Sequence, residues 1–418
     1  MRRTADQVVF ALLYSANVMM IFAHGLFGLG SVFTGVYLAS LTAFLILVGW
    51  WFWRGSNTVD YLVAALAALF AISLAVHPPH DLKPVALLVL SLAAYPAARG
   101  FGGCMQKPGF VATVAIIVAI GVIATLIAIL RPDTHGTVMI FGFDHGAAQF
   151  STLVGILIFA FACSSRPLFP LSMAIFLSVA VFVAAQVHLM FLMLLATLSG
   201  GAIISPTRLR RFVVISAVIV AAIVAGSISH GPKAKEFLGH FKEALLSRRD
   251  IASIQEPGSL APRITALGCP EVDLNNPLDV RKRLYKEAFR LLPSAGLSGF
   301  GLDRFKELSC IGTQVHNQIL QTAIEFGIPA GCVLVLALFC VSARLLQLAP
   351  TEPEALFALL SLTFVVLISC VYGIVSDSDF MFLTLGYASA TANIYGDNQV
   401  AHSASPFDRV VARNSEVR

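Results

Sequence analysis

The chain has 418 residues, of which 57% are hydrophobic and 12% are charged, and its mean hydropathy is +0.83. Soluble domains carry roughly 25% charged residues, so this composition excludes a soluble multidomain protein. A run of about 20 apolar residues can cross the hydrocarbon core of a bilayer, and the sequence contains many such runs. We therefore interpret the chain as a membrane protein that crosses the bilayer several times.

Twelve apolar stretches are predicted to form transmembrane helices, and most connections between them are rich in Gly, Pro and Ser. The first stretch follows Met1-Arg2-Arg3 and lacks a small-residue cleavage site, which indicates a membrane helix rather than a signal peptide. The predicted helices cover residues 7–29, 31–53, 59–76, 84–98, 109–130, 145–163, 168–186, 187–204, 212–228, 318–343, 355–373 and 379–396.

Basic residues in the short loops predict how the chain is oriented, because Lys and Arg are enriched on the cytoplasmic side. With the N-terminus inside, thirteen of the 28 basic residues fall on the inner side, and the short outer loops contain only Lys83 and Arg131. The expected organisation is nine helices in residues 1–228, an outer polar loop in 229–317, three helices in 318–396 and a cytoplasmic tail in 397–418.

The outer loop has helix-like stretches at 233–246 and 278–292, so it is more than a linker. It also contains Cys269 and Cys310, two of the seven cysteines. Because both are expected on the oxidising side of the membrane, they are candidates for a disulfide. Their spacing alone does not decide whether they pair.

Several common reaction motifs are missing from the sequence. It has no P-loop, GxSxG, HExxH or EF-hand pattern, which leaves ATP-driven transport and zinc hydrolysis without support. The outer turn His77-Pro78-Pro79-His80 offers no third ligand and is a poor metal site. We expect no metal, no cofactor and no nucleic-acid partner.

The most informative stretch lies where the polar loop re-enters the membrane. An apolar helical face is formed there by Ile319, Leu320, Ala323 and Ile324. Gly327 and Pro329 are expected to end that helix, and His316 lies at its start. A histidine can accept a proton near neutral pH, although at a membrane boundary it is often only an interfacial polar residue.

Two strings of residues in this region resemble a known family. They are His316-Asn317…Leu320-Gln321…Glu325-x-Gly327-Ile328-Pro329…Gly331, and upstream Arg281-x-x-x-Tyr285-x-x-Ala288 followed by Pro293-x-x-Gly296…Gly299-x-Gly301. Both are similar to signatures of the bacterial O-antigen ligase and O-antigen polymerase superfamily. The layout of twelve helices, with a large periplasmic loop between the ninth and tenth, is similar too.

The resemblance implies an all-α glycosyltransferase of the GT-C-like kind in the bacterial inner membrane, with its active site facing the periplasm. Members move a glycan from undecaprenyl diphosphate to a hydroxyl acceptor, with no metal and with inversion at the anomeric carbon. The implied partners are the lipid-linked glycan donor, a glycolipid or glycan acceptor, and the bilayer itself.

The resemblance also implies roles for particular residues. His316 would be the catalytic base, and Arg281 the first choice for binding the donor diphosphate, with Arg283 and Lys286 as secondary candidates. Supporting roles fall to Asn317, Tyr285 and Glu325, and we expect Glu325 to orient neighbouring backbone or an Arg rather than to touch substrate.

One position departs from the family pattern. The family usually has a Ser-Arg pair between the seventh and eighth helices, and its Arg contacts the diphosphate, whereas this chain reads Gln186-Val187-His188. Either His188 replaces that Arg, or a basic residue of the loop does, or the substrate differs.

Three classes of function remain open at this point. A lipid-linked glycan transferase would be either a ligase that uses lipid A–core as acceptor or a polymerase that extends another lipid-linked glycan. The alternatives are a transporter or flippase and a membrane scaffold. A transporter is expected to carry charges or broken helices at mid-membrane, whereas the polar residues of this chain are concentrated in its outer loop.

Overall fold

The computed structural model describes residues 4–16, 18–19, 21, 31–50, 55–130, 146–164, 169–185, 187–228, 277–371 and 379–403. Within these ranges all regular structure is helical and there is no strand. This agrees with the predicted all-α fold class. Three predicted features lie outside the described residues: the helix at 233–246, most of the second half of the helix 7–29, and Cys269.

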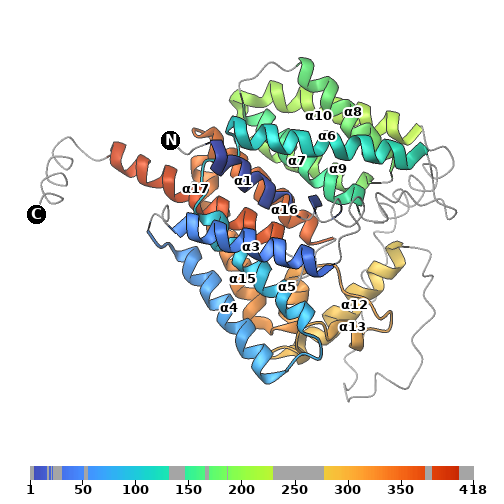
Figure 1. The fold of residues 1–418 in the computed structure, drawn as a ribbon, viewed down its shortest axis with the longest axis vertical. Coiled ribbons are helices and arrows are strands. Elements are labelled where there is room, and N and C mark those ends of the chain that lie inside the picture. Colours follow the sequence, from blue (N-terminus) through green and yellow to red (C-terminus); the bar gives the residue numbers. More distant parts are fainter. Residues whose placement is uncertain are drawn as a thin grey trace, which may run out of the picture.

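One layer of the molecule is a stack of five helices, shown in teal to lime in Figure 1. They are α6 (Pro108–Leu130), α7 (Gly146–Cys163), α8 (Phe169–Ala184), α9 (His188–Ile204) and α10 (Leu209–Ile228), with the short 3₁₀ helix η1 (Pro206–Arg208) leading into α10. These helices are apolar on nearly every side, as expected where one face meets protein and the other meets lipid.

A second layer contains helices from both ends of the chain (Figure 1). It comprises α3 (Ser31–Trp50), α4 (Thr58–Val76), α5 (Leu82–Arg99), α15 (Ile328–Leu348) and α17 (Asp379–Ser403). Two further helices, α1 (Thr4–Tyr14) and α16 (Pro353–Ser369), pack against both layers. One continuous hydrophobic core therefore runs through the two layers.

Five helices among the described residues are long and apolar enough to cross a bilayer. They span Thr58–Val76, Leu82–Arg99, Pro108–Leu130, Pro206–Ile228 and Ile328–Leu348. Five further apolar helices in the described part are shorter, with 10–17 residues. The structure thus has the character of a helical membrane protein, and the larger number of twelve spans stays a prediction.

The predicted helix 318–343 is wrong in one respect, because the chain forms two helices there. The first, α14 (Gln318–Glu325), has Phe326 as its C-cap, and α15 begins at Ile328 after Gly327. Gly327 has a φ of +98°, which an α-helix cannot accommodate. Another boundary also differs, because α17 continues to Ser403, beyond its predicted end at residue 396.

A small second core holds the polar loop against the ends of the spanning helices. It joins α12 (Pro277–Ala295), α13 (Phe305–Leu308) and α14. Its buried members are Leu284, Ala288, Leu291, Phe305, Val315, Leu320 and Ile324. Figure 1 shows α12 and α13 together at one end of α4, α5 and α15. The predicted helix at 278–292 is therefore confirmed as α12, and it has its own packing partner.

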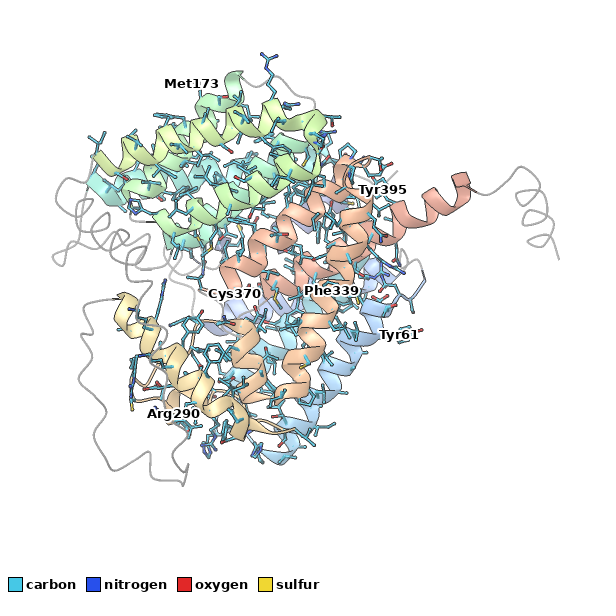
Figure 2. The ribbon with its side chains drawn as sticks, turned by 180° about the vertical axis from the view of Figure 1, so that it is seen from behind. Tyr61, Met173, Arg290, Phe339, Cys370 and Tyr395 are labelled. Carbon is cyan, nitrogen blue, oxygen red and sulfur yellow. The ribbon has the colours of Figure 1, made fainter. Side chains whose placement is uncertain are left out.

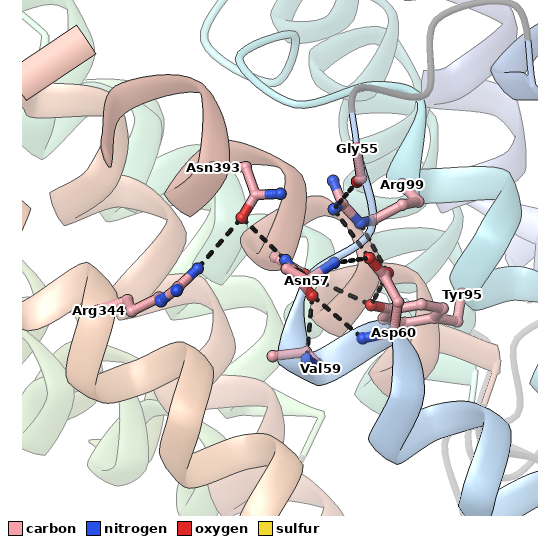
Figure 3. Close-up of polar contacts among 9 residues, drawn as sticks. Gly55, Asn57, Val59, Asp60, Tyr95, Arg99, Arg344 and Asn393 are labelled. Carbon is pink, nitrogen blue, oxygen red and sulfur yellow. Dashed lines mark hydrogen bonds and ion pairs between the residues drawn. The ribbon is translucent and has the colours of Figure 1, made fainter. Parts of the chain in front are cut away.

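A buried polar cluster ties the first turn of α4 to its neighbours (Figure 3). Asp60 accepts hydrogen bonds from Arg99 at 2.9 and 3.0 Å and from Tyr95 at 2.6 Å. The Arg99 and Asp60 side chains are 2% and 8% exposed. Asn57 caps α4 and donates to Ser389 of α17 at 2.9 Å. Because the charges and amides are paired with one another, the cluster has the character of a structural clamp.

Candidate functional site

Tyr285 connects three helices at the point where the polar loop meets the membrane helices. Its hydroxyl donates to the carbonyl oxygen of Cys370, directly after α16, at 2.6 Å. The same hydroxyl accepts from the Asn317 amide at 3.2 Å. Asn317 is also the N-cap of α14, because its side-chain oxygen accepts from Leu320 N–H at 2.9 Å. Two predicted supporting residues are thus brought together, and they fix α12 against the start of α14.

His316 directly precedes that N-cap and has an unusual backbone. Its φ is +54°, and Asp303, with a φ of +66°, is the other non-glycine residue with positive φ in the described part of the chain. Such conformations cost about 1–3 kcal/mol and persist where the surroundings over-determine them. The Asn317 cap and the Val315 side chain in the second core flank His316 and hold this segment. The imidazole is partly exposed.

Arg281 lies one helical turn before Tyr285 on α12, and it is partly exposed. Residues four apart on a helix share a face. Because Tyr285 is bonded to Asn317, the face of α12 that carries Arg281 turns toward the segment that carries His316. The hydrogen bonds of Tyr285 therefore bring the two predicted reactive residues to one end of the molecule.

Arg283 is engaged elsewhere. Its Nε donates to Glu287 Oε1 at 2.8 Å, one turn later on α12. The other oxygen of Glu287 accepts from the Ser309 hydroxyl at 2.8 Å and from Cys310 N–H at 3.2 Å. Arg283 thus stabilises a carboxylate that anchors residues 309–310, which makes it a weaker diphosphate candidate than the sequence indicated.

Lys286 is exposed and lies about 100° around α12 from Tyr285. Lys282 and Arg290, four residues before and after it, are exposed as well. Figure 2 shows Arg290 on the side of α12 that faces away from the spanning helices. Lys286 therefore belongs to an outward-facing basic row rather than to the face that carries Tyr285.

Cys310 is disulfide-bonded. Five other cysteines are not part of a disulfide, namely Cys104, Cys163, Cys332, Cys340 and Cys370. The predicted partner, Cys269, lies outside the described residues. The pairing of Cys310 with Cys269 stays a prediction.

His188 lies in the first turn of α9, where its Nε2 shares a hydrogen bond of 3.3 Å with Ser227 Oγ near the end of α10. Helix α9 packs on α16, and Tyr285 bonds the carbonyl that follows α16. Helix α16 therefore contacts both the helix that carries His188 and the site formed by α12–α14. A role for His188 in binding diphosphate stays a prediction.

Glycines from the two motif strings meet in one backbone crossing. The N–H groups of Phe300 and Gly301 donate to the carbonyls of Ile324 and Glu325 at 3.0 and 2.9 Å, and Ile328 N–H donates to Gly296 at 3.0 Å. At Gly299, with a φ of +70°, a Cβ would lie 2.2 Å from Glu325 O, and at Gly327 it would lie 2.1 Å from Leu297 O. These glycines are needed because only a residue without a side chain fits there.

The turn that carries His77 and His80 packs on this crossing. His77 Nε2 shares a hydrogen bond of 3.4 Å with Ser298 Oγ, and His80 Nε2 accepts from Arg304 at 2.7 Å. No group of three metal-ligating side chains occurs among the described residues. Both histidines thus act in holding the loop.

Glu325 is the end of a buried polar network that the sequence did not predict. Gln321 Nε2 donates to Glu325 Oε1 at 3.1 Å and to Gln314 Oε1 at 2.8 Å. Gln314 in turn donates to Asp303, which also accepts from Lys306. A signal was present, because polar residues recur at positions 318, 321, 322 and 325 with helical spacing. The apolar face of this helix alone does not reveal the network.

The charge state of Glu325 is shifted by its surroundings. The side chain is fully buried, and burial raises the pKa of its carboxyl to about 8, with a further contribution from the negative charge of Asp303. The Gln321 amide and the backbone N–H groups of Asp303 and Phe305 oppose the shift but do not cancel it. At neutral pH the carboxyl is therefore mostly protonated.

No protein-family model matches the chain, and a comparison with curated proteins finds none that is similar to it.

Proposed function

We propose that the protein is a membrane glycosyltransferase that moves a glycan from undecaprenyl diphosphate to the hydroxyl of a lipid A–core acceptor on the periplasmic face of the inner membrane. The observation that carries this proposal is the Tyr285–Asn317 hydrogen bond, because it joins the turn of α12 after Arg281 to the residue after His316. A base and a cation at the same end of the molecule are what the displacement of a diphosphate requires.

The proposed reaction is a direct displacement. The His316 imidazole takes the proton of the acceptor hydroxyl, whose oxygen attacks the anomeric carbon. A new C–O glycosidic bond forms as the C–O bond to the diphosphate breaks, and the configuration at that carbon inverts. The electron pair leaves with the diphosphate, which stays on the undecaprenyl lipid.

Arg281 is proposed to stabilise the charge that develops on the leaving diphosphate. A guanidinium offers a planar fork of N–H donors and stays charged at every working pH. Hydrogen bonds between such a cation and phosphate oxygens are among the strongest in proteins. A donor that carries its own leaving group also suits the periplasm, where no nucleotide supplies energy.

The second candidate within this class is a polymerase, which would use another lipid-linked glycan as acceptor. The chemistry at His316 and Arg281 would be the same. Lipopolysaccharide and lipid-linked glycans extracted from a deletion strain separate the two. Loss of transfer to lipid A–core, with full-length lipid-linked chains accumulating, is expected for the ligase. Short lipid-linked chains would instead identify a polymerase, and unchanged glycans would contradict both.

Two structural features bear on the transporter alternative. The break between α14 and α15 and the buried Asp60–Arg99 pair are features that transporters place at mid-membrane. Here the break precedes α15, and α15 is long enough to cross the bilayer without α14. Asp60 lies in the first turn of α4, and Arg99 lies in the last turn of α5. Both features thus fall at helix ends, which favours the transferase.

A further inference from the structure

Four side chains on one face of α14 each keep a buried polar atom without a hydrogen-bond partner. The atoms are Gln318 Nε2, Gln321 Oε1, Thr322 Oγ1 and Glu325 Oε2. All four residues are no more than 1% exposed. Their spacing of three and four residues places them along a single stripe. Buried polar groups are nearly always paired, so such a concentration within one eight-residue helix calls for a chemical explanation.

Two of these atoms belong to side chains that are already bonded to each other. Gln321 Nε2 donates to Glu325 Oε1 at 3.1 Å, and neither Gln321 Oε1 nor Glu325 Oε2 has a hydrogen-bond partner of normal geometry. The backbone N–H groups of Asp303 and Phe305 also act on the carboxyl, but no donor reaches Gln321 Oε1. A proton on Glu325 Oε2 supplies a donor for Gln321 Oε1, and the two side chains then form a closed acid–amide pair. A carboxylate would instead leave Gln321 Oε1 unsatisfied and would hold a charge inside a water-excluded core, and both are costly.

We propose that Glu325 is a positioning residue that works as a neutral acid, and that its pairing with Gln321 holds His316 in place. The structural part of this inference stands on the contacts of α14. The part that concerns His316 rests on the function proposed above, because it treats His316 as the base.

The route from Glu325 to His316 is short. Gln314 and Gln321 lie on either side of His316 in the chain, and their hydrogen bond of 2.8 Å closes the segment that contains it. Gln314 also donates to Asp303, so the network touches the segments of both non-glycine residues with positive φ. The same nitrogen of Gln321 serves Gln314 and Glu325, and losing the acid–amide pair would free Gln321 to move.

The charges around Glu325 favour the neutral acid. The loop before α13 contributes Asp303, a negative charge that Lys306 partly balances. From α12 comes the Arg283–Glu287 pair, whose charges offset each other. Helix α4 contributes the uncharged Ser73, whose hydroxyl donates to the Glu325 carbonyl at 3.2 Å, and α15 opens with four uncharged residues, 328–331. No cation contacts the carboxyl directly among the contacts of the described residues.

Infrared spectroscopy on the purified full-length protein tests the acid directly. The carbonyl band of a protonated carboxylic acid should be present at neutral pH and should disappear as the pH rises through about 8. Glu325→Gln should lack this band. Glu307→Gln is the matched control, because Glu307 is an exposed carboxylate on the neighbouring helix α13, and it should keep the band. A wild-type spectrum without a protonated glutamate near neutral pH would overturn the proposal.

The pH profile of transfer tests the positioning role. The rate should fall above about pH 8 as Glu325 ionises, because the acid–amide pair is then lost. Glu325→Ala should lower the rate roughly 10- to 100-fold, as misplaced groups do. Glu325→Gln keeps an N–H donor for Gln321, so its rate should be much closer to that of the wild type than the rate of Glu325→Ala. The fall in rate at high pH should be absent in Glu325→Gln.

The outcomes separate the two proposals. If Glu325→Gln falls in rate above pH 8 as the wild type does, or is as slow as Glu325→Ala while folded, the positioning role is wrong. If the wild type transfers no glycan to any acceptor, the proposed function fails, and the infrared result still decides whether Glu325 is a neutral acid. Thermal unfolding of each variant shows that it is folded.

Discussion

Arg281 and Arg283 differ by two positions on α12, and the structure gives them different surroundings. Arg283 forms an ion pair with Glu287, whereas Arg281 lies on the face of α12 that carries Tyr285. A Glu four residues after an Arg is a pairing that the sequence alone indicates. The second set of partners of Glu287, Ser309 and Cys310, is over twenty residues further along and depends on the tertiary fold.

The first prediction concerns Arg281. Arg281→Lys keeps the charge but loses the planar fork, so it should retain part of the transfer rate, and Arg281→Ala should retain almost none. Arg290→Ala, which removes an exposed cation from the same helix, is the control and should change the rate little. Transfer by purified protein in lipid nanodiscs, with excess EDTA present, measures this.

EDTA itself should leave the wild-type rate unchanged, because the guanidinium of Arg281 is proposed to stabilise the leaving diphosphate. A rate that EDTA abolishes and Mg²⁺ or Mn²⁺ restores would assign that charge stabilisation to a metal ion. A normal rate in Arg281→Ala would likewise contradict the account of this residue.

Glu325 shows what the sequence could and could not reveal about single residues. Its place in the motif string predicted a supporting role, and the helical spacing of its polar neighbours was visible. The raised pKa of Glu325 could not be predicted from the sequence. The shift comes from burial under segments 299–305 and 314–321, which only the folded chain brings together.

The pH dependence of stability follows from that pKa. An ordinary Glu titrates near 4.3 when the chain is unfolded. The folded protein holds the proton up to about pH 8, so it binds more protons than the unfolded state between these values. Stability should therefore fall as the pH rises through this window and level off above it. Glu325→Gln should flatten that fall, as unfolding midpoints across pH would show. Equal slopes for both proteins would contradict the shifted pKa.

At the scale of elements, the break between α14 and α15 was only half foreseen. Gly327 and Pro329 signalled the end of a helix, yet the apolar residues on both sides favoured one continuous span. The break is fixed by a contact that no local pattern contains, namely the crossing of residues 296–301 over residues 324–328. Most other helices agree with their predicted ranges within a few residues, because hydropathy dominates their formation.

A second prediction tests this crossing. Gly299→Ala must adopt a φ of +70° and also places a Cβ 2.2 Å from Glu325 O, whereas Gly296→Ala has a φ of +57° and nothing within 4 Å. Positive φ costs about 1–3 kcal/mol in either variant. The clash adds to this only at Gly299, so Gly299→Ala should unfold at a lower temperature and lose transfer. Equal unfolding temperatures for the two variants would show that the crossing is not tight.

At the scale of the whole molecule, the two helical layers share one core, and polar contacts tie their ends. Composition was enough to predict a helical membrane protein, because apolar runs of this length have few other structures available. The pairing of helices was not predictable, since α4 and α5 meet α17 from the far end of the chain. The contacts of Asp60 with Arg99 and of Asn57 with Ser389 likewise depend on the tertiary fold.

A third prediction concerns the clamp at α4 and α5. Removing one partner of a buried ion pair strands the other charge, so Arg99→Leu or Asp60→Asn should each lower stability by about 3–5 kcal/mol. The double variant should be less destabilised than the two single effects added together, because no charge is left unpaired. Unfolding of the four proteins in a double-mutant cycle measures the coupling. Additive effects would mean that the pair contributes no net interaction.

The central claim is that His316 is the base of a glycan transfer reaction, and one measurement tests it most directly. Purified wild type and His316→Ala are compared for transfer of glycan from the lipid-linked donor, with His80→Ala as a control for an outer histidine that binds Arg304. Removing a general base should slow the reaction by about 10²–10⁴-fold while membrane insertion and donor binding stay intact. Near-normal turnover by folded His316→Ala would contradict the account.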